Sequence, residues 1–175
     1  MKHKVFILFI SVLLFSCNNT EDEERGFVEN KAYQLINLIE DAENGDDAIL
    51  IIEETTEVAN SDTEESDTFI RILTIKNQEN LQALYFYLDL DSEGNTTEIT
   101  SMRYELFEED ILDTYLYDLE IEDENDNPQS LTYSILESTE SKFSITMSGV
   151  LSKFNTADNT YDTVEFSDVD LNIMF

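Results

Sequence analysis

The sequence contains few basic residues, one histidine, one cysteine and no tryptophan. Only 9 Lys and Arg residues stand against 40 Asp and Glu residues among 175 residues, and the formal net charge is −31. A protein that binds nucleic acid neutralises phosphates with basic side chains, so this imbalance excludes a nucleic-acid binder. The length is typical of one domain.

The only histidine is His3, in an N-terminal segment that we expect to be removed, and the only cysteine is Cys17. The rest of the chain therefore cannot hold a histidine-activated nucleophile or an ordinary zinc site. Carboxylate chemistry, as in glycoside hydrolysis, remains possible. However, candidate pairs arise by chance among 40 acidic residues, so their presence carries no weight and we expect no enzyme.

The first residues have the pattern of a secretory signal. Lys2 and Lys4 precede an apolar run over residues 5–15. As a helix this run would rise about 16 Å, against a hydrocarbon layer of about 30 Å. It is too short to stay in a membrane, and we predict that it is cleaved.

The end of this run, Leu14-Phe15-Ser16-Cys17, resembles the lipobox of bacterial lipoproteins, although Phe15 is bulkier than the residue usual at that position. The resemblance implies that Leu14 and Ser16 are recognised at the cleavage point and that Cys17 is acylated and becomes the first residue of the mature chain. No intramolecular disulfide can form with one cysteine, so lipidation gives Cys17 a role. The three acyl chains that the resemblance implies would hold the protein in a membrane. Ordinary secretion is the alternative.

Four consecutive acidic residues follow, Glu21, Asp22, Glu23 and Glu24. They resemble the export signal of surface-exposed lipoproteins of Bacteroidota, which implies the outer face of the outer membrane. A solvated, disordered tether explains the same charges. We therefore predict a signal peptide over residues 1–16, a lipidated Cys17 with a flexible acidic tether over residues 17–26, and one β-rich domain over residues 27–175.

Within the domain, apolar residues at helical spacing predict a helix over residues 27–43, with an edge strand as the alternative. After it the apolar pattern has a period of two, which predicts strands. The predicted strands span residues 48–52, 69–75, 81–90, 97–107, 114–121, 131–136, 142–151 and 161–174. Short polar connections join them as an antiparallel meander. We predict a mainly all-β fold, a β-sandwich or small barrel of about eight strands with one N-terminal helix.

Three details follow from the strand pattern. Residues 81–90 are apolar on both faces, which predicts a central strand that is covered on each side. Tyr115, Tyr117, Leu119 and Ile121 share one face. The alternation shifts in the last strand, which predicts a bulge at Ser167 or Asp168.

Two acidic turns resemble calcium sites. Asp89, Asp91 and Glu93 have the spacing that opens an EF-hand loop, but Thr100 stands where that family has its bidentate Glu, and a hairpin turn explains the same residues. The set Asp123, Asn125 and Asp126 resembles the calcium linker of cadherin repeats. Calcium is thus the one cofactor to consider, with solvated turns as the alternative.

Several tyrosines on the strands suit either a half-buried core or a platform for a sugar or peptide; they are Tyr85, Tyr87, Tyr104, Tyr115, Tyr117 and Tyr133. Together these features predict a lipid-anchored surface protein with a binding, adhesion or complex-accessory role and an unknown protein or glycan partner. A carrier with an apolar ligand inside a lipocalin-like barrel is one alternative. A carboxylate hydrolase is a second.

Overall fold

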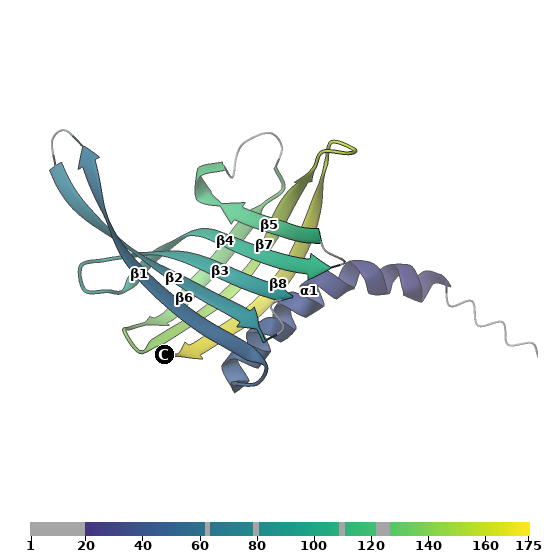
Figure 1. The fold of residues 1–175 in the computed structure, drawn as a ribbon, viewed down its shortest axis with the longest axis horizontal. Coiled ribbons are helices and arrows are strands. Elements are labelled where there is room, and N and C mark those ends of the chain that lie inside the picture. Colours follow the sequence, from purple (N-terminus) through teal and green to yellow (C-terminus); the bar gives the residue numbers. More distant parts are fainter. Residues whose placement is uncertain (1–19, 62–63, 79–80, 109–110, 122–126) are drawn as a thin grey trace, which may run out of the picture.

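The computed structural model describes residues 20–61, 64–78, 81–108, 111–121 and 127–175 (Figure 1). Leu14, Ser16 and Cys17 of the predicted lipobox lie outside the described residues. The predicted calcium ligands Asp123 and Asp126, together with Asn125 between them, also lie outside.

Helix α1 spans Thr20–Asn44 and includes the predicted helix over residues 27–43. Its buried stripe, Leu35, Leu38 and Ile39, faces the sheet, because apolar residues at this spacing share one face of a helix. The helix ends at Asn44, and Gly45 follows it with a φ of 70°, the left-handed conformation that commonly terminates a helix. The backbone of residues 20–26, predicted to be a flexible tether, forms the first turns of this helix.

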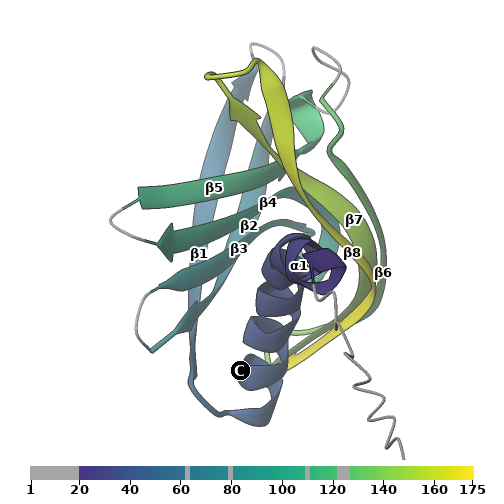
Figure 2. The ribbon, with the colours of Figure 1, turned by 90° about the vertical axis from the view of Figure 1, so that its right-hand side faces the viewer.

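Eight antiparallel strands in the described part of the chain make up one sheet. They are β1 Ala48–Ser61, β2 Glu64–Asn77, β3 Gln82–Leu90, β4 Thr96–Glu108, β5 Ile111–Asp118, β6 Ser130–Ser138, β7 Lys142–Asn155 and β8 Thr160–Met174, with a 3-10 turn, η1, over Leu119–Ile121. The sheet curls into a half-barrel around α1 (Figure 2). The prediction of an antiparallel all-β fold with about eight strands and one N-terminal helix is confirmed, and the sheet is one curled layer rather than two stacked layers.

The sheet has two parts, strands β1 to β5 and strands β6 to β8, which meet between β5 and β7. The strand order is β1-β2-β3-β4-β5-β7-β6, and β8 pairs with the other side of β7. β7 pairs with β6 along its first half, but its only ladder partner on β5 is Leu116, opposite Ser152. Consecutive strands pair except at β5 and β6, so the predicted meander is interrupted once.

The predicted bulge in the last strand is confirmed. Met147 pairs with Val169 and Gly149 pairs with Phe166, so β8 has one extra residue at this point. The extra residue is accommodated at Asp168, whose φ is 52°. The Asp168 backbone N–H donates to Ser148 Oγ at 2.9 Å, which satisfies an amide that the ladder leaves unpaired.

The core lies on the concave face of the sheet, against α1. Tyr104, Tyr115 and Tyr117 are buried there, so these three tyrosines belong to the core, as the first of the two alternatives for the strand tyrosines predicted. The prediction that Leu119 and Ile121 share this face is wrong. The strand ends at Asp118, and both side chains are exposed in η1.

β3 is central, as predicted, with β2 and β4 on its two sides. Its concave face is buried, but no described element covers its outer face. Within the described residues, no helix is long and apolar enough to span a membrane.

Candidate functional site

The end of the half-barrel that holds the C-terminus contains a buried arginine. Arg71 lies in the middle of β2, at a position where the strand alternation points side chains toward the concave face. Its side chain is only 3% exposed. It is the one buried charged residue in the part of the chain that the structure describes, and a buried charge requires partners.

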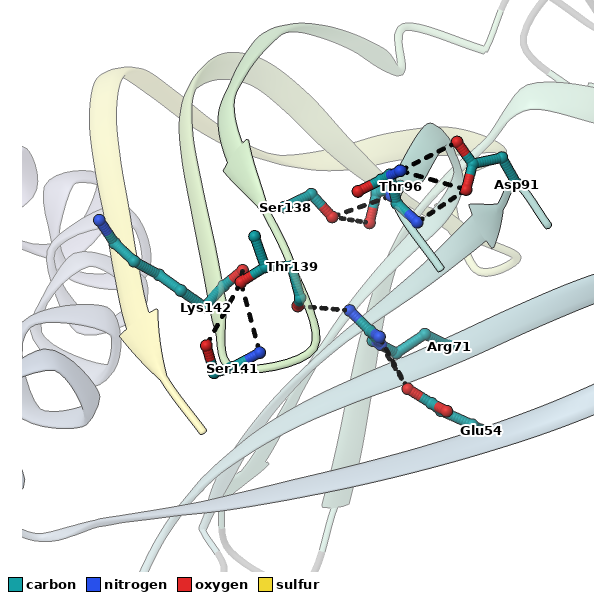
Figure 3. Close-up of polar contacts among 9 residues, drawn as sticks. Glu54, Arg71, Asp91, Thr96, Ser138, Thr139, Ser141 and Lys142 are labelled. Carbon is teal, nitrogen blue, oxygen red and sulfur yellow. Dashed lines mark hydrogen bonds and ion pairs between the residues drawn. The ribbon is translucent and has the colours of Figure 1, made fainter. Parts of the chain in front are cut away.

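Arg71 is held by three elements, and Figure 3 shows its bonds to two of them, at Glu54 and Thr139. Its Nε donates to Glu54 Oε1 at 2.8 Å, and its Nη2 lies 2.8 Å from the same oxygen. Its Nη1 donates to the backbone oxygen of Thr139 at 3.3 Å, in the turn between β6 and β7. The Phe175 ring lies 5.6 Å from the guanidinium carbon. Arg71 therefore ties β1 and β2 to the last three strands.

Further hydrogen bonds fix the surroundings of Arg71. Ser138 Oγ accepts from the Thr96 backbone N–H and donates to Thr96 Oγ1, both at 2.9 Å, so β6 is joined to the start of β4. Thr139 Oγ1 accepts from the Ser141 backbone N–H at 3.3 Å and donates to the Lys142 backbone oxygen at 3.4 Å (Figure 3). The turn that supplies an acceptor to Arg71 is thus held in place before any ligand arrives.

A pocket of about 440 Å³ opens beside Arg71. It is lined by Glu54, Phe69, Arg71, Leu90, residues 91–94 and Glu140. Arg71 uses three of its five N–H donors on Glu54 and Thr139, and the other two have no acceptor among the described residues. The lining thus combines guanidinium donors with carboxylate acceptors, which suits a polar ligand that both donates and accepts hydrogen bonds.

The turn between β3 and β4 forms one wall of this pocket. The Asp91 carboxylate accepts the backbone N–H groups of Glu93 and Asn95, each at 2.9 Å, and the Asn95 side-chain amide at 3.1 Å. These bonds, the backbone bond from Asn95 above all, hold the pKa of Asp91 below its ordinary value. Gly94, with a φ of 82°, makes the sharp bend. The residues thus form the hairpin turn that we gave as an explanation of the EF-hand resemblance.

The structure separates the predicted calcium ligands of this turn. Asp91 and Glu93 line the pocket, whereas Asp89 lies on β3 and pairs with Glu98 of β4. Among the described residues there is no group of three or more His, Cys, Asp or Glu side chains placed to hold a metal ion.

Sequence reasoning missed Arg71 and Glu54. A signal was present: Arg71 is the only charged residue in the apolar run Phe69–Ile75, at the position of an inward side chain. A lone arginine at such a position indicates a buried charge with a partner. The partner in the turn between β6 and β7 could not be read from the sequence, because the contact joins residues 68 positions apart.

Comparison with known proteins found no family model, no curated protein and no solved structure that matches this chain.

Proposed function

We propose that this protein is a lipoprotein anchored through Cys17 and displayed on the outer face of an outer membrane, where it has a binding, adhesion or complex-accessory role. The observation that carries the proposal is the lipobox-like run ending at Cys17, directly behind a signal-type apolar segment in a chain with no other cysteine. The acidic residues Glu21 to Glu24 support surface display.

The pocket beside Arg71 supports a binding role. Its lining combines guanidinium donors with carboxylate acceptors, which suits hydrogen bonding to a polar partner. The carrier alternative needs space inside the half-barrel, and Leu35, Leu38 and Ile39 of α1 occupy the concave face. A carrier would therefore have to move α1. The proposed partner is a protein or a glycan that meets the surface on the outside of the cell.

Metabolic labelling tests the anchor. Cells that express the full chain are grown with an alkyne fatty acid, and the protein is isolated and probed for the label. We expect label on the wild type and none on Cys17→Ser, with the wild type alone retained in the outer membrane. An unlabelled wild type that is released into the medium would show ordinary secretion.

Protease treatment of intact cells tests surface display. The protein should be cut in intact cells, while a periplasmic control protein survives until the cells are lysed. Replacing Glu21, Asp22, Glu23 and Glu24 together by Ala or Asn should leave the lipid label in place and protect the chain from the protease. Survival of the wild type in intact cells would contradict display on the surface.

A further inference from the structure

The pocket beside Arg71 combines apolar side chains, a buried donor and several carboxylates. Phe69 of β2 pairs with Leu90 of β3 and lies on the same side of the sheet as Arg71, so two half-buried apolar side chains adjoin the guanidinium. The pocket volume of about 440 Å³ is within the range of about 300 to 1,000 Å³ that is usual for ligand sites. The space therefore accommodates a ligand larger than an ion.

Arg71 is a donor that the described chain leaves partly unused. Its side chain is 3% exposed, and two of its five N–H groups have no acceptor among the described residues. A buried donor without an acceptor costs free energy, so an acceptor on a ligand would stabilise the site. The charge of Arg71 is already matched by Glu54. A neutral oxygen, such as a backbone carbonyl, therefore meets the need.

The pocket as a whole is negatively charged. One guanidinium stands against four carboxylates, which leaves a charge of −3; the carboxylates are those of Glu54, Asp91, Glu93 and Glu140. Glu93 and Glu140 are exposed and form no ion pair with any described residue. An anionic ligand would be repelled here, and a cation would be attracted.

A lysine or arginine residue within a peptide has the three features that this lining requires. A backbone carbonyl can accept from Arg71, the aliphatic stem can cover Phe69 and Leu90, and the charged end can reach the carboxylates. The Phe69 ring also attracts a cation. A neutral glycan would leave the carboxylates without a counter-charge, and a free polyamine would bring no acceptor for Arg71.

The position of the pocket near the edge of the sheet favours an extended segment. β1 is the first strand in the order of the sheet, and no described strand pairs with its other edge (Figure 1). Residues 53–56 of β1, which include Glu54, are exposed. The unpaired backbone groups of an edge strand can hydrogen-bond to an added strand. A peptide that runs along β1 can therefore place a basic side chain beside Glu54.

We infer that the pocket beside Arg71 binds a lysine or arginine residue in an extended segment of a partner protein. In this complex Arg71 donates to a backbone carbonyl of the segment, and Glu93 and Glu140 accept hydrogen bonds from the basic side chain. The place of the partner outside the cell rests on the proposed function.

Peptide binding to the purified full chain in mild detergent tests the inference by calorimetry. The probe is acetyl-Val-Lys-Val-Lys-Val-amide, in which both lysines lie on one side of an extended chain. The matched neutral probe has glutamine at both positions, and 1,5-diaminopentane provides the charges without a carbonyl. We expect the lysine peptide to bind about tenfold more tightly than either of the other probes.

Variants locate the binding at 0.15 M ionic strength, where charges more than about 8 Å apart are largely screened. Glu140→Gln should weaken binding of the lysine peptide about threefold to fivefold. Glu165→Gln is the matched control, because it removes the same charge from an exposed position outside this pocket, and it should leave binding unchanged. Arg71→Met should weaken binding about threefold to tenfold through the lost hydrogen bond, although it removes a positive charge from the pocket. Thermal melting confirms that each variant is folded.

Several outcomes would overturn the inference. Equal losses from Glu140→Gln and Glu165→Gln would show only the general attraction of a molecule with a net charge of −31 for cations. Unchanged or tighter binding by Arg71→Met would exclude a hydrogen bond from its guanidinium. No binding of the lysine peptide, equal binding of the glutamine peptide or of diaminopentane, or tighter binding of maltotriose, as the glycan probe, would each contradict a basic protein segment. The lipid label on Cys17 is measured separately, so failure of the binding test leaves the proposed anchor standing.

Discussion

At the scale of single residues, the two members of the Arg71 and Glu54 ion pair differ in burial. The Arg71 side chain is 3% exposed, whereas the Glu54 side chain is 58% exposed. Removing Glu54 leaves a buried guanidinium without its carboxylate, whereas removing Arg71 leaves a carboxylate that water can solvate. We therefore expect Glu54→Ala to lower the free energy of unfolding by about 2 to 3 kcal/mol. Arg71→Met, which keeps an apolar side chain in the site, should change it by about 1 kcal/mol or less. Equilibrium urea unfolding measures both.

Glu54→Gln is the matched control for this prediction, because it retains an oxygen acceptor for Arg71 and should cost less than Glu54→Ala. A larger loss from Arg71→Met than from Glu54→Ala would contradict the argument. It would mean that the bond from Arg71 to the Thr139 backbone oxygen, and not the ion pair, dominates the stability of this end of the half-barrel.

Calcium binding at the turn between β3 and β4 depends on the oxygens of Asp91. The Asp91 oxygens already accept N–H groups from Glu93 and Asn95, so a calcium ion would have to displace the Asn95 side-chain amide. We expect this turn to give no calcium-specific change in Tm. A bound ion at a hundredfold excess over Kd would add about 2.7 kcal/mol, which corresponds to roughly 5 to 11 °C in Tm for a domain of this size.

The measurement is a thermal melt with calcium or chelator at matched ionic strength, with magnesium as the control. If calcium alone raises Tm, the variants Asp89→Asn with Asp91→Asn, and Asp123→Asn with Asp126→Asn, will show which segment binds it. If only Asp89→Asn with Asp91→Asn abolishes the rise in Tm with calcium, the turn between β3 and β4 binds the ion, and our expectation for this turn is contradicted.

At the scale of strands and turns, two glycines have different roles. Gly94 has a positive φ with open space around it, whereas a Cβ atom at Gly149 would lie 2.4 Å from the Ser130 backbone oxygen of the paired strand. Gly149→Ala should therefore cost about 2 to 3 kcal/mol through steric overlap. Gly94→Ala should cost about 1 kcal/mol through backbone strain.

Asparagine distinguishes the two causes, because Asn tolerates the left-handed conformation but is larger than Ala. In urea unfolding, Gly94→Asn should be more stable than Gly94→Ala, and Gly149→Asn should be less stable than Gly149→Ala. The reverse order at position 149 would show that β6 and β7 separate easily at this point.

The junction of β5 and β7 depends on few interactions. The two strands share a single ladder pair, Leu116 with Ser152. In addition, Lys153 of β7 donates a hydrogen bond to the Asp113 carboxylate of β5. That hydrogen bond, and then the charge of Asp113, raise the pKa of Lys153 above its ordinary value of 10.5. Protonated Lys153 therefore stabilises the fold at every pH below that ordinary value, and its contribution is lost as the pH rises through the raised value.

Lys153→Met should cost about 0.5 to 1 kcal/mol at neutral pH, since both side chains are partly exposed and the ion pair is screened by water. The difference from the wild type should shrink in high salt and above the raised pKa of Lys153. A double-mutant cycle with Asp113→Asn isolates the pair. A coupling energy that is the same in low and high salt would indicate packing of the lysine stem instead of charge.

At the scale of the whole molecule, the sequence predicted the parts of the fold that local patterning controls. The apolar pattern located all eight strands that the structure describes. It also located the bulge at Asp168, because the alternation of apolar residues shifts by one position there. The early start of α1 was missed, although Thr20 followed by Glu23 matches a capping box and acidic residues favour a helix N-terminus. The extension of β1 to Ser61 was missed because its last residues are polar.

The candidate site depends on contacts that no local pattern contains. Arg71 meets Thr139 and Phe175 only because the sheet curls and brings its last strands back toward β2. The sequence showed an arginine inside an apolar strand but not its partners. The same limit applies to the outer face, where the pattern of β3 predicted a cover that no other described part of the chain supplies.

The net charge of −31 acts on the molecule as a whole and gives the last prediction. Like charges repel more strongly in the compact state than in the unfolded chain, so folding is opposed at low salt. The Debye length falls from about 30 Å at 0.01 M to about 8 Å at 0.15 M ionic strength, and the repulsion falls with it. We therefore expect Tm to rise by several degrees over this range, equally in sodium and potassium chloride. A Tm that is constant or falls with salt would mean that specific ion pairs, such as Lys153 with Asp113, outweigh the general repulsion.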